Sequence, residues 1–262
     1  MFRSRQRIEV KTRGEIEAMR EAGLVVARAL DQISRLAAPG VTTADLDECA
    51  ADTISEAGAL PSFLGYHGFP AHICTSVNHE VVHGIPGSTT LREGDLVSVD
   101  CGAIVDGWHG DAAVTLAIGA VSPQAQDLSD VTHRALWAGL GAAVPGGRLS
   151  DIGYAVQSSV ESEGEYGIVE EYVGHGIGSS MHMEPAVPNY GRPGRGVRLV
   201  AGMALAVEPM ITLGSPAVHT LDDEWTVVTD DGALAAHWEH TVAITEEGPW
   251  VLTSLDGVRL SE

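Results

Sequence analysis

Pro39-Gly40-Val41-Thr42-Thr43-Ala44-Asp45-Leu46 and Pro145-Gly146-Gly147-Arg148-Leu149-Ser150-Asp151-Ile152 align with each other without gaps. The offset is 106 residues at both ends of the matched segment, from Pro39 to Pro145 and from Gly58 to Gly164. Each copy follows a long amphipathic stretch. The pattern predicts a duplicated unit of two helices and a sheet, with a ligand site where the two halves meet. A match this short also arises by chance, so the duplication is a hypothesis.

Capping signals and apolar spacing predict four helices around these segments. Thr12 and Glu15 form a capping-box signature, and apolar residues then recur every three or four positions. Ser122-Pro123 is typical of an N-cap followed by proline at the first helical position. The expected helices run from Thr12 to Pro39-Gly40, over Thr43–Ala57, onward from Ser122-Pro123, and from near Ser150 to Gly164.

Short apolar runs bounded by turn residues follow each helix pair and predict strands. The runs are His72–Val77, Leu96–Ile104, Ala112–Ile118, Met203–Ile211, Trp225–Thr229 and Thr241–Thr245. Few of them are separated by helices, which favours an antiparallel sheet backed by helices. We therefore expect a single α+β domain over residues 1–262, with halves at about 12–120 and 121–252.

Composition excludes several classes of protein. The 36 acidic and 15 basic residues give a formal net charge of −21, which argues against direct nucleic-acid binding. Lys11 is the single lysine and lies in no phosphate-loop motif. The three cysteines form no C-x-x-C pair, and no run is long and apolar enough for a membrane span or a secretory signal. We expect a soluble cytoplasmic protein.

Four carboxylates lie inside or beside apolar runs: Asp100, Asp111, Glu208 and Glu239. Any one of them alone is more simply explained as edge-exposed or salt-bridged. With so few basic residues, however, all four cannot easily find a cationic partner, and a metal is the partner that neutralises several carboxylates at once. His175, in Gly-His-Gly-Ile-Gly, adds one imidazole. Oxygen ligands with one imidazole predict two divalent cations of the Mn²⁺, Fe²⁺, Co²⁺ or catalytic Zn²⁺ kind, which together activate water for hydrolysis.

These five residues and the sequence motifs around them resemble those of the methionine aminopeptidases. The matching motifs are Cys74-Thr-Ser-Val-Asn78, His83-Gly-Ile-Pro86, Asp106-Gly-Trp-His-Gly-Asp111, Gly174-His-Gly-Ile-Gly178, His182-x-Glu184-Pro185, Glu208-Pro-Met210 and Glu239-His-Thr241. The resemblance extends from about Thr12 to Leu252 and implies the duplicated "pita-bread" fold with pseudo-two-fold symmetry. Only 25 residues separate His182 from Glu208, and no N-terminal extension precedes the match, which resembles the short bacterial type I enzymes.

The resemblance also implies a role for each site residue. Asp100 would hold the first metal, Asp111 and Glu239 would bridge both, and His175 and Glu208 would hold the second. Glu208 would also shuttle the proton of the attacking water, and His182 would hydrogen-bond the developing oxyanion. His83 would contact the scissile amide or donate a proton. The remaining histidines are expected to be structural or solvent-facing: His67, His72, His79, His109, His133, His219, His237 and His240.

An apolar pocket for the methionine side chain is implied as well. The matching positions are Phe63, Tyr66, Phe69, Cys74, Met181 and Trp225. Sulfur–aromatic contacts favour a thioether in such a pocket. The chain departs from familiar bacterial members at Phe63, where they have cysteine, and at Met181, where they have phenylalanine.

The resemblance implies that the enzyme removes the initiator methionine from nascent polypeptides whose second residue is small and uncharged. It would act as a monomer near the ribosome exit. Two alternatives stay open at this point. A proline-specific aminopeptidase or prolidase shares the fold but usually carries an additional N-terminal domain. Metal-free pita-bread proteins serve as binding modules but have lost ligands, whereas all five ligand positions are filled here.

The start of the chain provides a test of this specificity. The sequence begins Met1-Phe2, and a phenylalanine is too large for a site that accepts only small second residues. We therefore expect the protein to retain Met1, whereas Phe2→Ala should yield a chain that begins at alanine. Intact-mass spectrometry distinguishes the two. A wild-type chain lacking one methionine would count against the specificity, unless another protease removes it.

Overall fold

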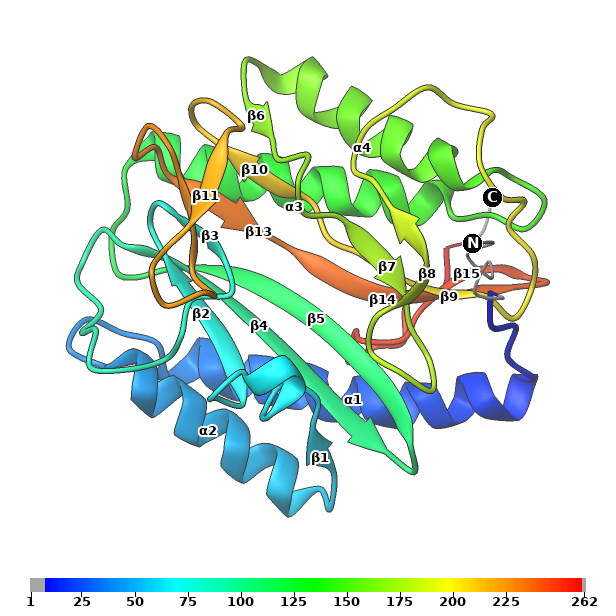
Figure 1. Ribbon diagram of the computed structural model, residues 1–262, viewed down its shortest axis with the longest axis horizontal. Helices are drawn as coiled ribbons and strands as arrows, with labels where there is room; N and C mark the ends of the chain where they lie inside the picture. Colours follow the sequence, from blue (N-terminus) through cyan, green and yellow to red (C-terminus); the bar gives the residue numbers. More distant parts are fainter. Residues whose placement is uncertain (1–7, 261–262) are drawn as a thin grey trace.

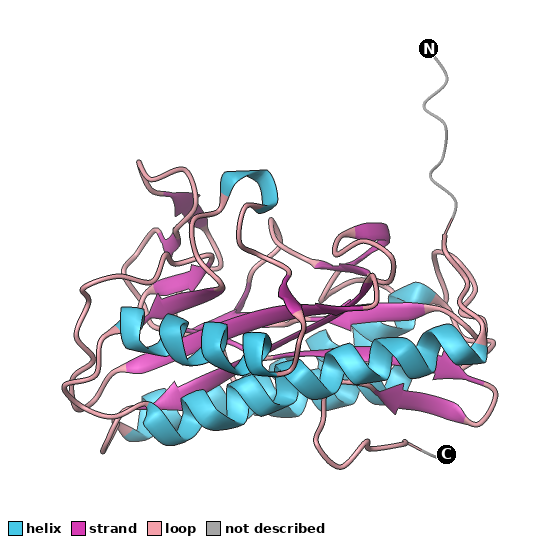
Figure 2. Ribbon diagram, turned by 90° about the horizontal axis from the view of Figure 1, so that it is seen from below, coloured by secondary structure: helices cyan, strands magenta, loops and turns pink. Residues whose placement is uncertain are grey.

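A long antiparallel sheet carries the fold, and the four helices lie together against one of its faces (Figures 1 and 2). The structure, a computed structural model, describes residues 8–260, so the Met1-Phe2 prediction lies outside the described residues. The helices are α1 (Arg13–Leu36), α2 (Thr43–Glu56), α3 (Pro123–Ala142) and α4 (Leu149–Glu163), with a short 3-10 helix at Tyr66–Gly68. None of the described helices combines the length and apolarity needed to cross a membrane.

The strands form one large sheet and two small ones. In chain order they are β1 (Leu60–Pro61), β2 (Ile73–Val77), β3 (Glu80–Val82), β4 (Leu96–Val105), β5 (Trp108–Ala117), β6 (Gly167–Ile168), β7 (Gly174–Gly176), β8 (Met183–Val187), β9 (Ala204–Val207), β10 (Met210–Thr212), β11 (Val218–Thr220), β12 (Val227–Thr229), β13 (Ala235–His237), β14 (Glu239–Thr245) and β15 (Gly248–Val251). The nine-stranded sheet has the order β1-β4-β5-β14-β9-β7-β8, with β2 beside β4 and β15 beside β14. The smaller sheets are β13-β10-β6 and β11-β12-β3. Every pair is antiparallel, which confirms the predicted α+β class.

The helix starts follow from local hydrogen bonds that the sequence encodes. The backbone N–H of Thr42 donates to Asp45 at 2.7 Å at the start of α2, and the backbone N–H of Arg148 donates to Asp151 at 2.7 Å at the start of α4. In the first helix the Thr12 N–H donates to the Glu15 carboxylate at 2.6 Å. These bonds satisfy backbone donors that a helix end otherwise leaves unpaired. Helices α2 and α4 thus start with the same bond at positions 106 residues apart, from 42 to 148.

The predicted strand Met203–Ile211 is wrong as a single element. It divides into β9 and β10, which belong to different sheets. Pro209 lies at the division and has no N–H to donate to a ladder, so the strand pairing of β9 cannot continue through it. The break leaves Glu208 at the end of β9, outside the strand ladder. The predicted strand from Trp225 also starts later, at Val227, because the backbone N–H groups of Trp225 and Thr226 donate to Asp223 instead.

Helix α1 packs unusually close to the sheet, and two glycines make this possible. A Cβ added at Gly110, on β5, would lie 2.7 Å from the backbone nitrogen of Gly23 on α1. A Cβ added at Gly23 would overlap the carbonyl oxygen of Leu252. Because adjacent strand residues point to opposite faces, the contact of Gly110 with α1 leaves Asp111 directed away from the helix.

This contact predicts a large difference between two glycine substitutions in the same helix. Gly23→Ala should lower the free energy of unfolding by about 1–3 kcal/mol, because the methyl group overlaps backbone that cannot move freely. Gly14→Ala should be neutral or stabilising by up to about 1 kcal/mol, because a Cβ there meets nothing within 4 Å and alanine favours the helix. Urea unfolding measures both. Equal effects would show that the close approach does not constrain the fold.

Candidate active site

The sequence-predicted site residues converge on one cavity of about 310 Å³. Its lining consists of Phe63, Tyr66, His67, Phe69, Cys74, His83, Asp100, Asp111, His175, Met181, His182, Glu208, Trp225 and Glu239. The list contains every predicted ligand, catalytic residue and pocket residue. It adds His67, which is solvent-exposed as expected but also lines the cavity.

Strand register brings the carboxylates together. Glu239 on β14 pairs with Ala113 on β5, Ala113 pairs with Asp100 on β4, and Asp100 pairs with Cys74 on β2. Residues opposite one another in such a row share a face of the sheet, and Asp111 shares it too because it lies two positions before Ala113. The alanine between Glu239 and Asp100 leaves space between their carboxylates.

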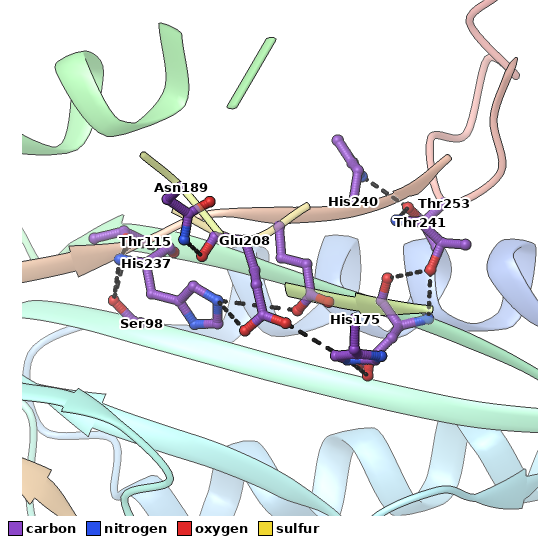
Figure 3. Close-up of polar contacts among 11 residues, drawn as sticks. Ser98, Thr115, His175, Asn189, Glu208, His237, His240, Thr241 and Thr253 are labelled. Carbon is purple, nitrogen blue, oxygen red and sulfur yellow. Dashed lines mark hydrogen bonds and ion pairs between the residues drawn. The ribbon is translucent and has the colours of Figure 1, made fainter. Parts of the chain in front are cut away.

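The other two predicted ligands come from the neighbouring strands. His175 on β7 pairs with Ala206 on β9, and Glu208 follows the end of β9. His175 Nε2 lies 3.5 Å from Glu208 Oε1 (Figure 3). It also lies 3.9 Å from Asp111 Oδ2. Donor atoms of Asp111, His175 and Glu239 all lie within 4.8 Å of one another, a spacing compatible with a shared metal ion.

The acidic side chains that line the cavity are concentrated in a small volume and have few compensating partners. Asp111 and Glu239 are only 4% and 2% exposed. Asp100 Oδ1, Asp111 Oδ1 and Glu239 Oε1 are buried without a hydrogen-bond partner. In the part of the chain that the structure describes, only histidines come within ion-pair distance of Asp111, Glu208 and Glu239, and no lysine or arginine does. Orphaned carboxylate oxygens next to one imidazole fit divalent cations of the Mn²⁺, Fe²⁺, Co²⁺ or Zn²⁺ kind.

Burial perturbs the acid–base chemistry of these residues. It raises the pKa of Asp100 to about 7. Burial and the neighbouring carboxylates raise the pKa of Asp111, Glu208 and Glu239 well above the usual range. Burial lowers the pKa of His175 to about 3, so its ring is neutral at pH 7. Because its Nδ1 lies 3.0 Å from the carbonyl oxygen of Gly176, which can only accept, Nδ1 carries the proton and the Nε2 lone pair is free for a metal.

The predicted catalytic and pocket residues form the other walls of the cavity. His182 Nδ1 lies 2.9 Å from the Tyr66 hydroxyl, and its ring lies 4.2 Å from that of His175. His83 has a left-handed backbone (φ 60°), and its ring packs edge-to-face on Trp225 at 6.4 Å. The remaining wall is a cluster of Phe63, Phe69, Cys74 and Met181, all buried.

A second layer of polar residues supports the carboxylates, and sequence reasoning missed most of it. Thr241 Oγ1 accepts from the backbone N–H of Asp111 at 3.1 Å and donates to its carbonyl at 2.8 Å. Asn189 Nδ2 donates to the backbone carbonyl of Glu208 at 3.0 Å (Figure 3). His237, expected to be structural or solvent-facing, is 2% exposed and directs Nε2 toward Glu208 and Glu239. Its position two residues before Glu239 was the signal available in the sequence for a place near the site. The predicted strand began only at Thr241, however, and so did not include His237.

Comparison with known proteins agrees with this geometry. Residues 17–246 match the model of metallopeptidase family M24. A "Methionine aminopeptidase" of Clostridium acetobutylicum is 56% identical over 247 residues, which cover 94% of this chain and 98% of that protein. The chain belongs to family M24, and within it to the methionine aminopeptidases.

Solved structures distinguish the assignment to the methionine aminopeptidases from the prolidase alternative. The crystal structure of methionine aminopeptidase from Thermotoga maritima has a TM-score of 0.93 at 43% identity and covers 95% of this chain and 100% of its own. The prolidase from Pyrococcus furiosus has a TM-score of 0.75 at 22% identity, and the match covers 94% of this chain but 65% of the prolidase. The likeness to the prolidase therefore concerns the fold alone. The fold of this methionine aminopeptidase is the predicted pita-bread arrangement.

The raised carboxyl pKa values predict how the metal-free protein responds to pH. A buried acid binds its proton more tightly in the folded chain than in the unfolded chain, where its pKa is about 4. The stability of the metal-free protein should therefore fall as pH rises toward the folded-state pKa values. The clearest interval is about pH 7.5 to 8.5, because unfolded-state histidines, with a pKa of about 6.5, are almost all deprotonated there and no longer contribute.

Thermal unfolding in a chelator, and again with Mn²⁺, tests this prediction. The Tm should fall with pH in the chelator, and the fall should be much smaller with Mn²⁺, which compensates the ionised carboxylates. A Tm that rises with pH in the chelator over this interval would contradict the electrostatic description.

Proposed function

We propose that this methionine aminopeptidase removes N-terminal methionine from peptides by hydrolysis at a pair of divalent cations. The observation that carries the proposal is the position of the carboxylates. Five ligand-type side chains line the same cavity of about 310 Å³ as an apolar, aromatic-rich group of side chains that includes one methionine. A peptide whose first side chain enters among these apolar groups would bring its first peptide bond near the carboxylates.

The donor set supports a specific arrangement of ligands. Asp100 would hold one cation, Asp111 and Glu239 would contact both, and His175 and Glu208 would hold the other. Orphaned oxygens on Asp100, Asp111 and Glu239, and the free Nε2 lone pair of His175, support this assignment. When bound, such a pair supplies an activated water at neutral pH and polarises the scissile carbonyl.

The remaining groups would handle the substrate and the protons. His182 Nδ1 lies 2.9 Å from the Tyr66 hydroxyl. In the tautomer in which that hydroxyl is the donor, Nε2–H of the neutral ring would be free to donate to the oxygen of the scissile carbonyl. The Glu208 carboxylate, raised in pKa by burial, is suited to take a proton from the attacking water and pass it to the leaving amine. His83 lies on the cavity wall beside Trp225, where it would contact the amide.

Side-chain selection would come from the apolar end of the cavity. Phe63 and Phe69 pack edge-to-face at 6.5 Å, and Phe69 packs on Trp225 at 5.0 Å. Aromatic edges offer favourable contacts to a thioether sulfur, and Met181 adds an adaptable wall. The aromatic ring at Phe63 and the flexible side chain at Met181 would give this pocket a shape different from that of relatives with cysteine and phenylalanine there.

We further propose that the enzyme is a cytoplasmic monomer that acts on nascent chains near the ribosome exit. The net charge of −21 gives no attraction to ribosomal RNA, so the peptide itself would be what it recognises.

Methionine release from Met-Ala-Ser peptides tests the activity directly. The metal-free protein should release no free methionine, and addition of Co²⁺ or Mn²⁺ should start the release. Asp111→Asn should abolish both the activity and tight metal binding, because it weakens a ligand shared by both cations. The matched control is Asp106→Asn, the same change at an exposed turn residue outside the cavity, which should stay active. Full activity and metal content in Asp111→Asn would refute the proposal.

Replacement of His182 separates substrate stabilisation from metal binding. His182→Ala should lower kcat by about 10²–10³ while leaving the bound metal near its normal level. The reason is its position beside His175 without being one of the five ligands. Elemental analysis and steady-state kinetics on the same preparation decide the matter, and loss of a metal ion would make His182 a ligand instead.

A further inference from the structure

His237 is a buried side chain to which the reaction described above assigns no role. It ends β13, and hydrogen bonds fix its backbone to the strands that carry Asp100 and Asp111. Its N–H donates to Thr115 Oγ1 at 3.0 Å and lies 3.2 Å from Ser98 Oγ, and its carbonyl accepts from Thr115 at 2.8 Å (Figure 3). The position of the imidazole is therefore set by β4 and β5, which also set the positions of the two aspartates.

The free end of this imidazole points at the carboxylates and has no partner. His237 Nε2 lies 3.9 Å from Glu208 Oε2 and 4.0 Å from Glu239 Oε2, and it makes no hydrogen bond in the described structure. These distances exceed a normal N–H···O bond by about 1 Å. A buried polar nitrogen without a partner destabilises a fold, so an imidazole placed beside two carboxylates calls for a functional explanation.

Of the two carboxylates, Glu208 is the one that needs positioning. Glu239 lies within the β14 ladder, whereas Glu208 lies beyond the end of β9 and is followed by Pro209. Its carboxylate lies between two imidazoles, with Oε1 facing His175 at 3.5 Å and Oε2 facing His237 at 3.9 Å. Asn189 holds its backbone carbonyl from the other side. His237 is thus placed to set the rotation of the Glu208 carboxylate.

We propose that His237 is a positioning residue: its Nε2–H donates to Glu208 Oε2 and so keeps Oε1 directed to the metal position shared with His175. This inference rests on the proposed dinuclear centre. The bond requires a movement of about 1 Å by the carboxylate, a shift that a metal drawing Oε1 into place can produce. Groups of this kind, which orient a ligand without binding the metal, typically change metal affinity by about 10–100-fold when removed.

Calorimetric titration of the metal-free protein with Mn²⁺ tests the proposal without reference to activity. His237→Leu removes the donor and should weaken one of the two Mn²⁺ sites by about 10–100-fold. His237→Gln keeps an N–H donor of similar reach and should bind Mn²⁺ close to wild type. The control is His72→Leu, because His72 also faces a carboxylate, that of Asp47 at 2.8 Å, but lies outside the cavity. It should leave Mn²⁺ binding unchanged.

Thermal unfolding of the same metal-free proteins separates positioning from a structural role. Leucine removes an unpaired buried donor, so the Tm of metal-free His237→Leu should equal or exceed that of wild type, whereas His72→Leu should lower it. If His237→Leu does not fold, His237→Met takes its place in both measurements.

Each other outcome has a separate meaning. Wild-type Mn²⁺ affinity in the variants without a donor overturns the role of His237. An equal weakening of Mn²⁺ binding in His237→Gln overturns that role as well. So does a weakening in His237→Leu that is accompanied by a lowered Tm. If wild-type protein itself binds no pair of Mn²⁺ ions, or Asp111→Asn binds them as tightly, the proposed centre fails instead.

Discussion

Four carboxylates clustered in the middle of an apolar sheet, with no cationic side chain beside them in the described residues, are the constraint on which the structure depends. A buried carboxylate is stable only if it is protonated, hydrogen-bonded or neutralised. Several of these oxygens have no hydrogen-bond partner, and burial raises all four pKa values, so the metal-free chain favours the protonated forms. The proposed divalent cations would satisfy the same oxygens at neutral pH. The folding requirement and the catalytic requirement would then be met by the same ions.

The fold serves this cluster by fixing backbone positions tightly. Long paired strands hold Asp100, Asp111 and Glu239 in register, and small residues such as Ala113 leave room between them. On the opposite face, Gly110 allows α1 to lie directly against β5, so the strand that carries Asp111 is supported from behind. The interruption of strand pairing at Pro209 leaves Glu208 outside the strand ladder, so strand pairing does not fix the position of Glu208. A residue proposed both to bind metal and to move a proton is thus the one held by side chains and not by strand pairing.

Much of this architecture was predictable, for reasons that differ between elements. The helix starts were predictable because capping depends on residues three positions apart, as in Thr12 and Glu15 or Thr42 and Asp45. The role of the four carboxylates was predictable because burying an acid among apolar residues costs free energy unless a partner neutralises it. The pocket residues were predicted from the family resemblance. The short strands β3, β7 and β13 were missed, because three residues contain too little periodicity to identify. His237 was missed for the same reason. Its partners come from β4, β5 and the end of β9, and only the folded chain brings them together.

The central proposal is that the clustered carboxylates and His175 hold two metal ions in the cavity. Anomalous diffraction from crystals soaked in Mn²⁺ tests it most directly, because it locates the ions without relying on turnover. We predict two anomalous peaks within bonding distance of the carboxylates, with Asp111 and Glu239 contacting both and His175 contacting one. Peaks at other positions, or none among these residues in crystals that diffract well, would contradict the account.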